Sequence, residues 1–430
     1  MKEITYIIIV FCVFISNAQN QIPGEKHNQS TLFQNAKIVT VTGEIIEKGH
    51  LGISQGVIDY IGSSAPEKQY TNKINLNGKH IYPGFIALNS TLGLVEVDAV
   101  RASDDESEIG IFNPNIRSII AYNAESKIVE TMRMNGVLLA QVTPRGGVVS
   151  GSSSVVQLDA WNWEDAAIKT DEGIHVNWPS AYSRASRWAP GPRTLSPSTT
   201  YLSNVERIKS VFHNAKNYLN DTNKEDLRLS SMQGLFNGTQ TLYLHLNNKR
   251  QIQDASSFFK SLGIEKVVLV GAREAHQIPE FLKEHNILVV AAHPHRLPSS
   301  EDADVKEAFN LGKKLDEAGV IFGIDVRGQM ERMNTRNLPF YAGSFVGHGL
   351  NYNAAVKSLT INAAKILGID DKYGSLEVGK SATFFVSEGD ALDMRTNIVH
   401  SAYIDGRELE LVTHQTKLRD KYLEKVERNN

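Results

Sequence analysis

The run from Ile81 to Leu94 constrains the fold of this chain more than any other stretch. Its first part, Ile81 to Ser90, is almost continuously apolar, and Pro83 and Gly84 stand near its start. Proline cannot donate a ladder hydrogen bond and glycine weakens a strand, so this pair marks the point where a strand enters from a different structural unit. The run therefore predicts the first strand of a barrel.

Further strand-like runs follow along the middle of the chain. They are Val137 to Thr143, Ser153 to Asp159, Ile174 to Trp178, Thr241 to Leu246, Lys266 to Gly271, Ile287 to His293 and Val320 to Asp325. Amphipathic segments rich in Lys and Glu separate the later runs, at Gln251 to Leu262, Ala272 to Glu284 and Ser299 to Ala318. Strands that alternate with helices in this way predict an α/β fold, a (β/α)8 TIM-like barrel, whose chemistry would lie at the carboxyl ends of its strands.

Short alternating runs broken by turns occur at both ends of the chain, before residue 80 and after residue 375. They predict a composite β-sandwich domain built from both termini, residues 32–80 and 368–412, around a barrel of residues 81–367. A region rich in Ser, Pro, Arg and Trp predicts a flap inserted at about 179–219, and a C-terminal helical tail is expected at 413–430.

Charge and cysteine content narrow the classes of function. The formal charge is −3, from 45 basic and 48 acidic residues, so the chain lacks the excess of positive charge that binding to nucleic acid or an anionic membrane requires. The expected partner is a small-molecule substrate or ligand. The single cysteine, Cys12, lies in the N-terminal segment, so a mature chain would have no disulfide and no thiol catalysis.

The first residues have the pattern of a signal peptide, residues 1–18. Lys2 precedes an apolar run from Ile7 to Ile15, and Ser16-Asn17-Ala18 places small residues where a signal peptidase would cut. The run is short for a bilayer span, although an uncleaved anchor is the alternative. We therefore expect an exported protein, periplasmic or secreted, with no stable membrane anchor after cleavage.

The Ile81–Leu94 run resembles the amidohydrolase superfamily, near its imidazolonepropionase-like and prolidase-like branch. The stretch from Gly374 to Ala382 resembles the closing Gly-Ser-Leu-Glu-x-Gly-Lys-x-Ala motif of that family. In the family, the first strand leads into a His-x-His pair that supplies two metal ligands. Asn89 and Thr91 occupy those positions here. The resemblance thus implies the barrel together with a degenerate metal site, in which zinc or another divalent metal is weakly bound or absent.

The resemblance also assigns roles to two residues at predicted strand ends. It implies that Asp325 accepts a proton from the attacking water and that His245 is a metal ligand. The alternatives are an Asp that caps the following loop and a His that packs in the core. His293 and His295 flank Pro294 at the end of another strand, and with His245 and Asp325 they would form a relocated metal site of three imidazoles and a carboxylate.

Two loops are candidates for substrate binding. Arg145, Gly146 and Gly147 begin a loop rich in glycine and hydroxyl residues that would present backbone N–H groups to an anion or carbonyl, or would serve only as a flexible connection. Arg336 lies just after the last predicted barrel strand, where it would clamp a carboxylate in bidentate fashion or remain a solvated side chain.

The resemblance implies a metal-dependent hydrolase that acts on a non-peptide C–N bond, in a cyclic amide or amidine or a dipeptide-like substrate. Neutral amide and hydroxyl oxygens bind zinc poorly compared with imidazole, so a second hypothesis stands beside the first. The protein would then be a catalytically inactive relative that acts as a ligand-binding or partner subunit. A homo-oligomer, or pairing with a related active subunit, is consistent with either hypothesis.

Overall fold

The computed structural model describes residues 22–26, 29–184, 195–218, 225–299, 302–328 and 330–428. The predicted signal peptide lies outside these residues, as does part of the predicted flap.

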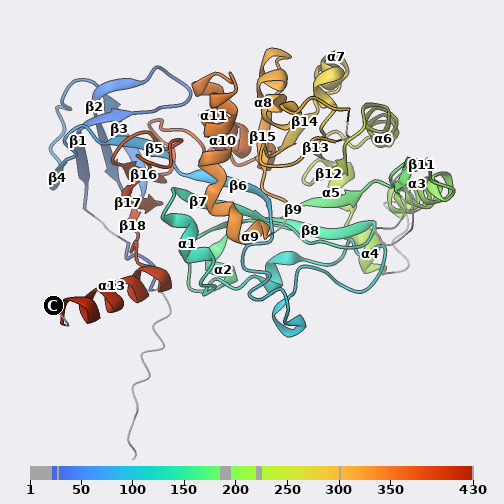
Figure 1. The fold of residues 1–430 in the computed structure, drawn as a ribbon, viewed down its shortest axis with the longest axis horizontal. Coiled ribbons are helices and arrows are strands. Elements are labelled where there is room, and N and C mark those ends of the chain that lie inside the picture. Colours follow the sequence, from blue (N-terminus) through green and yellow to red (C-terminus); the bar gives the residue numbers. More distant parts are fainter. Residues whose placement is uncertain are drawn as a thin grey trace, which may run out of the picture.

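The centre of the molecule is a closed eight-stranded barrel, in the order β12-β13-β14-β15-β6-β7-β8-β9 (Figure 1). Its strands are β6 (Phe85–Ser90), β7 (Val137–Val142), β8 (Val149–Gln157), β9 (Ala167–Asn177), β12 (Thr241–Leu246), β13 (Val267–Gly271), β14 (Leu288–Ala292) and β15 (Phe322–Asp325). The predicted mixed α/β fold with a closed barrel is therefore confirmed.

One strand differs from the predicted (β/α)8 pattern. β8 runs antiparallel to both of its neighbours, β7 and β9. A parallel crossover needs a dozen or more residues, whereas only 143–148 connect β7 to β8. The connection reverses at Gly146 and Gly147, whose φ angles are 81° and 60°. The expectation of uniform alternation of parallel strands and helices is therefore wrong at β8, and it holds from β9 onward.

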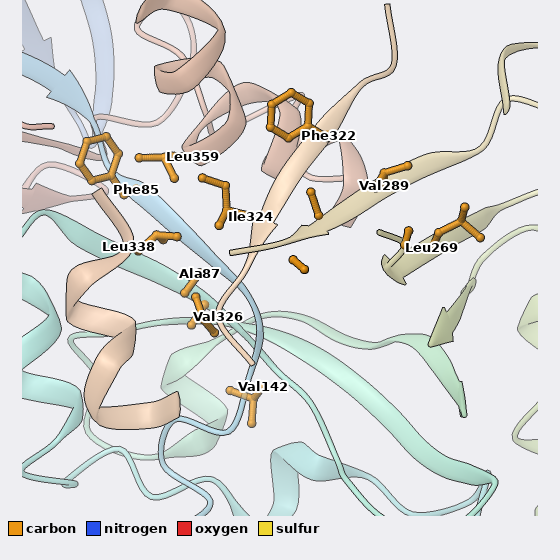
Figure 2. Packing of buried hydrophobic residues seen from close by; sticks show 14 of the residues in the cluster. Phe85, Ala87, Val142, Leu269, Val289, Phe322, Ile324, Val326, Leu338 and Leu359 are labelled. Atoms are coloured by element: carbon orange, nitrogen blue, oxygen red, sulfur yellow. The ribbon is translucent and has the colours of Figure 1, made fainter. Parts of the chain in front are cut away.

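Helices cover the outer face of the later strands. They are α6 (Lys249–Ser261), α7 (Pro279–Glu284), α8 (Glu307–Glu317), α10 (Leu338–Gly347), α11 (Tyr352–Leu359) and α12 (Ile361–Leu367). Strand residues alternate between the two faces of the barrel, so Phe85 and Ala87 pack outward while Ile86 and Leu88 point inward. Figure 2 shows the outer packing, in which Phe322 and Ile324 of β15 lie among side chains such as Leu338 and Leu359.

Both ends of the chain meet in a second sheet of eight strands. They are β1 (Thr31–Ile38), β2 (Ile46–Ser54), β3 (Val57–Gly62), β4 (Asn72–Asn75), β5 (His80–Pro83), β16 (Phe384–Ser387), β17 (Val399–Ile404) and β18 (Arg407–Glu408). β5 joins the two ends, since it pairs with β1 on one side and β16 on the other. The finer prediction of a β-sandwich stays a prediction.

The change of structural unit at Pro83 and Gly84 is visible in the strand pairing. Pro83 ends β5 in the terminal sheet, and Phe85 begins β6 in the barrel. A Cβ atom on Gly84 would lie 2.9 Å from Leu138 Cδ1, so the close approach of the two units requires glycine at this point.

The remaining elements are short or peripheral. They are α1 (Val129–Arg133), α2 (Trp163–Ala166), α3 (Tyr201–Tyr218), α4 (Leu227–Ser230), α5 (Gln233–Asn237), α9 (Glu331–Asn334), α13 (His414–Glu427), β10 (Tyr182–Arg184), β11 (Leu195–Pro197) and the 3-10 turns η1 (Arg101–Ser103), η2 (Ser118–Ala121), η3 (Ala275–Gln277) and η4 (Thr335–Asn337). Among the described residues, none of the helices has the length and apolarity needed to cross a membrane.

Candidate functional site

Asn89 starts a buried polar layer at the carboxyl end of the barrel. Its φ angle is 53°, a left-handed conformation that asparagine adopts more readily than most residues, and the pairing of β6 with β7 shifts register there. This bulge redirects the side chain, so that Nδ2 donates to Asp325 Oδ1 at 2.8 Å. The backbone N–H of Asn89 donates to Gln141 Oε1. The first strand therefore ends in a fixed amide instead of a projecting ligand.

Arg145 holds this layer together. Its Nη1 donates to Asn89 Oδ1 at 2.8 Å, and its Nη2 donates to the Asn89 carbonyl and to Glu331 Oε1, both at 2.7 Å. Thr91 Oγ1 donates to the same Glu331 oxygen at 2.8 Å. Because all four residues are buried, these are charge-assisted bonds with little solvent screening. The two positions that the family resemblance assigns to metal ligands are thus tied into a closed hydrogen-bonded set around a guanidinium.

Asp325 lies at the end of β15, next to that set. Its Oδ1 accepts hydrogen bonds from Asn89 Nδ2 and from the backbone N–H of Arg327, the second at 2.9 Å. Burial raises the pKa of the Asp325 carboxyl to about 6, while these bonds and the nearby charge of Arg145 act in the opposite direction. Within the described part of the chain, nothing hydrogen-bonds to Oδ2. One oxygen is therefore fixed and the other is left for a ligand.

His245 lies at the end of β12 and is paired with a second histidine, His175 of β9. His245 Nε2 lies 2.9 Å from His175 Nδ1, and His175 Nε2 lies 2.8 Å from Ser153 Oγ. Burial lowers the pKa of both imidazoles well below the usual value, so both are neutral at pH 7. The ring of His175 also stacks on Tyr243, with centroids 4.5 Å apart.

The hydrogen bonds fix the direction of this histidine chain. Arg327 Nη1 donates to His245 Nδ1 at 3.3 Å, so the proton of neutral His245 must be on Nε2. His245 then donates to His175, which donates to Ser153, and Ser153 donates to Glu172 Oε1. The chain links the surface guanidinium of Arg327 to a fully buried carboxylate. His175 and Glu172 went unrecognised in the sequence, where the only available signal was a histidine inside a predicted strand.

A pocket of about 540 Å³ opens above Asp325 and His245. Its other chemistry-bearing side chains are Arg273, Arg296, Arg327, His293 and His295. His293 stacks on Tyr341 with centroids 4.9 Å apart, and His295 Nε2 lies 2.8 Å from Ser344 Oγ. The predicted residues His245, Asp325, His293 and His295 therefore line one pocket, each held by different neighbours.

The donor set at the first-strand positions does not fit a divalent metal. Asn89 Oδ1 already accepts from Arg145, and the Thr91 hydroxyl donates its proton to Glu331. A metal ion there would also lie beside the positive guanidinium of Arg145. Across the described ranges, no three His, Cys, Asp or Glu side chains are grouped so that they could hold a metal ion. The relocated site of His245, His293, His295 and Asp325 stays a prediction.

The two predicted binding loops have different positions. The loop after β7 places Arg145 in the barrel, while the Gly146 and Gly147 carbonyls accept hydrogen bonds from Asn177 Nδ2. A Cβ atom on Gly147 would lie 2.8 Å from the Ile111 carbonyl oxygen, so the glycine permits close packing of this loop. Arg336 is exposed and lies apart from the residues that line the pocket. The structure thus brings Arg145 to the site and leaves Arg336 outside it.

The closed eight-stranded barrel places this chain among the α/β-barrel proteins. Its polar pocket lies at the carboxyl ends of the strands, where the active sites of such barrels are found. Residues 237–409 match the model of the amidohydrolase family. The predicted resemblance to the amidohydrolase superfamily is therefore confirmed.

Several solved structures share this fold. An amidohydrolase from Thermotoga maritima MSB8 has a TM-score of 0.76 at 22% identity, covering 88% of this chain and 99% of that one. A prolidase complexed with N-methylphosphonate-L-proline has a TM-score of 0.53 at 14% identity, covering 89% and 99%. A zinc-bound adenosine deaminase from Xanthomonas campestris has a TM-score of 0.54 at 13% identity, covering 91% and 96%. No curated protein matches the chain significantly.

Proposed function

We propose that this amidohydrolase-superfamily protein hydrolyses a C–N bond in a small molecule bound at the barrel mouth, with Asp325 as the proton acceptor. The substrate class is a cyclic amide or amidine or a dipeptide-like compound. The observation that carries the proposal is the geometry of Asp325, whose Oδ1 is held by two donors while Oδ2 is uncommitted in the lining of the pocket. A general base needs this combination of fixed orientation and a free oxygen.

The chemistry of the reaction uses groups that line the pocket. Asp325 Oδ2 accepts a proton from water as the water oxygen attacks the amide carbon, and the C–N bond breaks when that proton passes to the leaving nitrogen. Arg327 lies at the same pocket, where its guanidinium can donate to the oxyanion that forms on the carbonyl oxygen. Neutral His245 keeps Arg327 in place by accepting a hydrogen bond from it.

The proposal includes a degenerate metal site. Amidohydrolases generally use a divalent metal such as zinc, and one structural neighbour contains it. In this chain the Arg145 guanidinium, bound to Asn89 and Glu331, supplies a fixed positive charge close to Asp325.

A second candidate is a non-catalytic ligand-binding or partner subunit. The closed set of Asn89, Thr91, Arg145 and Glu331 favours this candidate. Asn89 and Thr91 occupy the positions of the family's metal ligands, but their side-chain oxygens are engaged in hydrogen bonds to Arg145 and Glu331. The pocket beside that set would then bind a small molecule without turning it over.

The test is hydrolysis by the purified mature chain of a panel of N-acyl amino acids, dipeptides and cyclic amides. The proposed enzyme should release amine from at least one compound, and Asp325→Asn should reduce kcat/KM by about 100-fold or more, the scale of a lost general base. Arg395→Gln, at an exposed arginine paired with Asp393, is the matched control and should keep full activity. A compound that binds but is hydrolysed by neither the natural chain nor the control would favour the second candidate.

Export is part of the proposed role, on the strength of the residue pattern at 1–18. The full-length chain, expressed in a bacterial host, should be recovered from the periplasm or the medium with an N-terminus near Gln19. Amino-terminal sequencing checks this, and recovery of the intact N-terminus in the cytoplasm would contradict it. A homo-oligomer or a pairing with a related active subunit is proposed with the second candidate.

A further inference from the structure

Arg296 is a buried cation without a hydrogen-bonding partner. Its side chain is 10% exposed, and Nε, Nη1 and Nη2 are all buried and make no hydrogen bond within the described residues. The closest carboxylate contact is Nη1 to Glu307 Oε2 at 4.0 Å, and that oxygen already accepts from the backbone N–H of Ser299 at 2.7 Å. A guanidinium has five N–H donors, so a whole set of donors is left unused at the wall of the pocket.

The neighbours of Arg296 increase this excess of positive charge. Arg273 and Arg327 line the same pocket, and Asp325 is its only carboxylate among the described lining residues. Arg273 is close enough to lower the pKa of Arg296, although burial is the larger cause, and Arg273 Nε is itself buried without a partner. His293 also lines the pocket, and its Nδ1 is buried and makes no hydrogen bond within the described residues. Among the described lining residues, three arginines thus stand against one carboxylate.

Leaving such a group unpaired is costly. A buried polar group without a partner costs about 1–3 kcal/mol, and more when it is charged. Folding alone gains nothing from the donors left unpaired on the Arg296 guanidinium and at Arg273 Nε. An anion bound against these side chains would bring acceptor atoms to them. The cavity of about 540 Å³ is large enough for a small organic molecule.

We propose that Arg296, Arg273 and Arg327 form an anion subsite, and that the ligand of this pocket carries a carboxylate or phosphate group. The planar fork of a guanidinium matches either group in bidentate geometry. Arg296 is the buried anchor of the subsite, and Arg327, which is exposed at the rim, meets the ligand first. The inference deepens the proposed function by giving the substrate a negative charge, but it needs only the pocket and holds without catalysis.

The experiment measures binding of simple anions to the full mature chain by calorimetry and by thermal shift. The probes are inorganic phosphate and succinate, with neutral succinamide as the uncharged counterpart of succinate. We expect phosphate or succinate to bind and to raise Tm, and succinamide to do neither. Which anion binds more tightly identifies the group as phosphate or carboxylate. Binding should weaken as sodium chloride is added, because salt competes for the same cations.

Variants assign the binding to the subsite. Arg296→Met keeps an unbranched apolar side chain but removes the guanidinium, and it should weaken anion affinity at least tenfold. Arg327→Gln, at the exposed rim, is the second variant, and it removes the hydrogen bond to His245 but leaves no buried charge unpaired. Arg395→Gln, far along the chain and exposed, is the matched control and should bind as the natural chain does.

The outcomes separate this inference from the proposed hydrolysis. Absence of binding by both anions, or affinity that is equal in Arg296→Met, Arg327→Gln and the control, overturns the subsite whether or not any amide is hydrolysed. In contrast, Asp325→Asn should still bind the anion, and more tightly, because a like charge has been removed. A chain that binds the anion but hydrolyses nothing loses the proposed activity and keeps the subsite.

Discussion

Arg145 and Arg296 are two guanidinium groups near the same end of one barrel, and their surroundings are opposite. Arg145 donates to Asn89 and Glu331 at distances of 2.7 to 2.8 Å. The guanidinium of Arg296 donates to nothing within the described residues. Both have lost most of their hydration, so the cost of burial is similar, but only the first is compensated by hydrogen bonds within the described part of the chain. Arg145 is therefore held by the folded structure itself, whereas the hydrogen-bonding capacity of Arg296 is left for the proposed anion.

The largest expected effect is that of replacing Arg145. Arg145→Met leaves the buried Glu331 carboxylate without its counter-ion and Asn89 without two hydrogen bonds. Removing one partner of a buried pair costs about 3–5 kcal/mol, so the free energy of unfolding should fall by that amount. Urea denaturation followed by circular dichroism measures it.

A matched control tests whether the effect comes from burial. Arg117→Met removes an ion pair to Asp171 whose side chains are 43% and 29% exposed, and it should cost less than about 1 kcal/mol. Adding Glu331→Gln to Arg145→Met should restore part of the loss, because the unpaired charge is removed as well. Equal losses in the Arg145 and Arg117 variants would show that the Arg145 set is not the closed structure described above.

The next effect concerns Asp325. Its hydrogen bonding is intermediate between that of the two arginines, because Oδ1 accepts two hydrogen bonds and Oδ2 accepts none within the described residues. Its pKa is raised from 3.8 to about 6, so between these pH values the folded chain binds more protons than the unfolded chain. Stability therefore falls as pH rises from about 4 to about 6 and stays lower above that range. The full shift corresponds to about 3 kcal/mol.

Asp325→Asn removes this dependence, since asparagine can keep the acceptor oxygen for Asn89 and for the N–H of Arg327. The variant should be more stable than the natural chain by up to about 3 kcal/mol at pH 8, and nearly equal to it at pH 4. Urea denaturation at the two pH values checks the sign. A difference that is the same at pH 4 and pH 8 would mean that burial does not oppose ionisation of this carboxyl.

The closed barrel could be predicted from the sequence because each of its strands is indicated by a short apolar run of neighbouring residues. Apolar runs such as Thr241–Leu246 coincide with the observed strand, and Pro83 with Gly84 marks the actual change of unit. The antiparallel direction of β8 was not predicted, because it depends on the length and turn geometry of the connection at 143–148. Hydrophobic periodicity indicates a strand but not its direction.

The site was less predictable for a related reason. Asp325 and His245 stand at strand ends, and both line the pocket as their positions suggested. The role of Arg145 depends on Glu331, which is 186 residues away in the chain, and no spacing rule connects them. His175 and Glu172 belong to a strand whose inward residues become visible only when the barrel closes. The missing partners of Arg296 are a property of the folded chain alone.

The smallest expected effect is on the other side of the comparison, at Arg296. Without any anion present, Arg296→Met removes a charge that has no hydrogen-bonding partner and leaves apolar atoms in its place, so the chain should gain about 1 kcal/mol of stability. This change is opposite in sign to that of Arg145→Met. Saturating phosphate or succinate should reverse the order, because the natural chain gains binding energy in proportion to RT ln(1 + [L]/Kd) and the variant does not. Urea denaturation with and without the anion measures both. A loss of stability in the absence of anion would mean that the chain does compensate Arg296, and the contrast between the two arginines would then disappear.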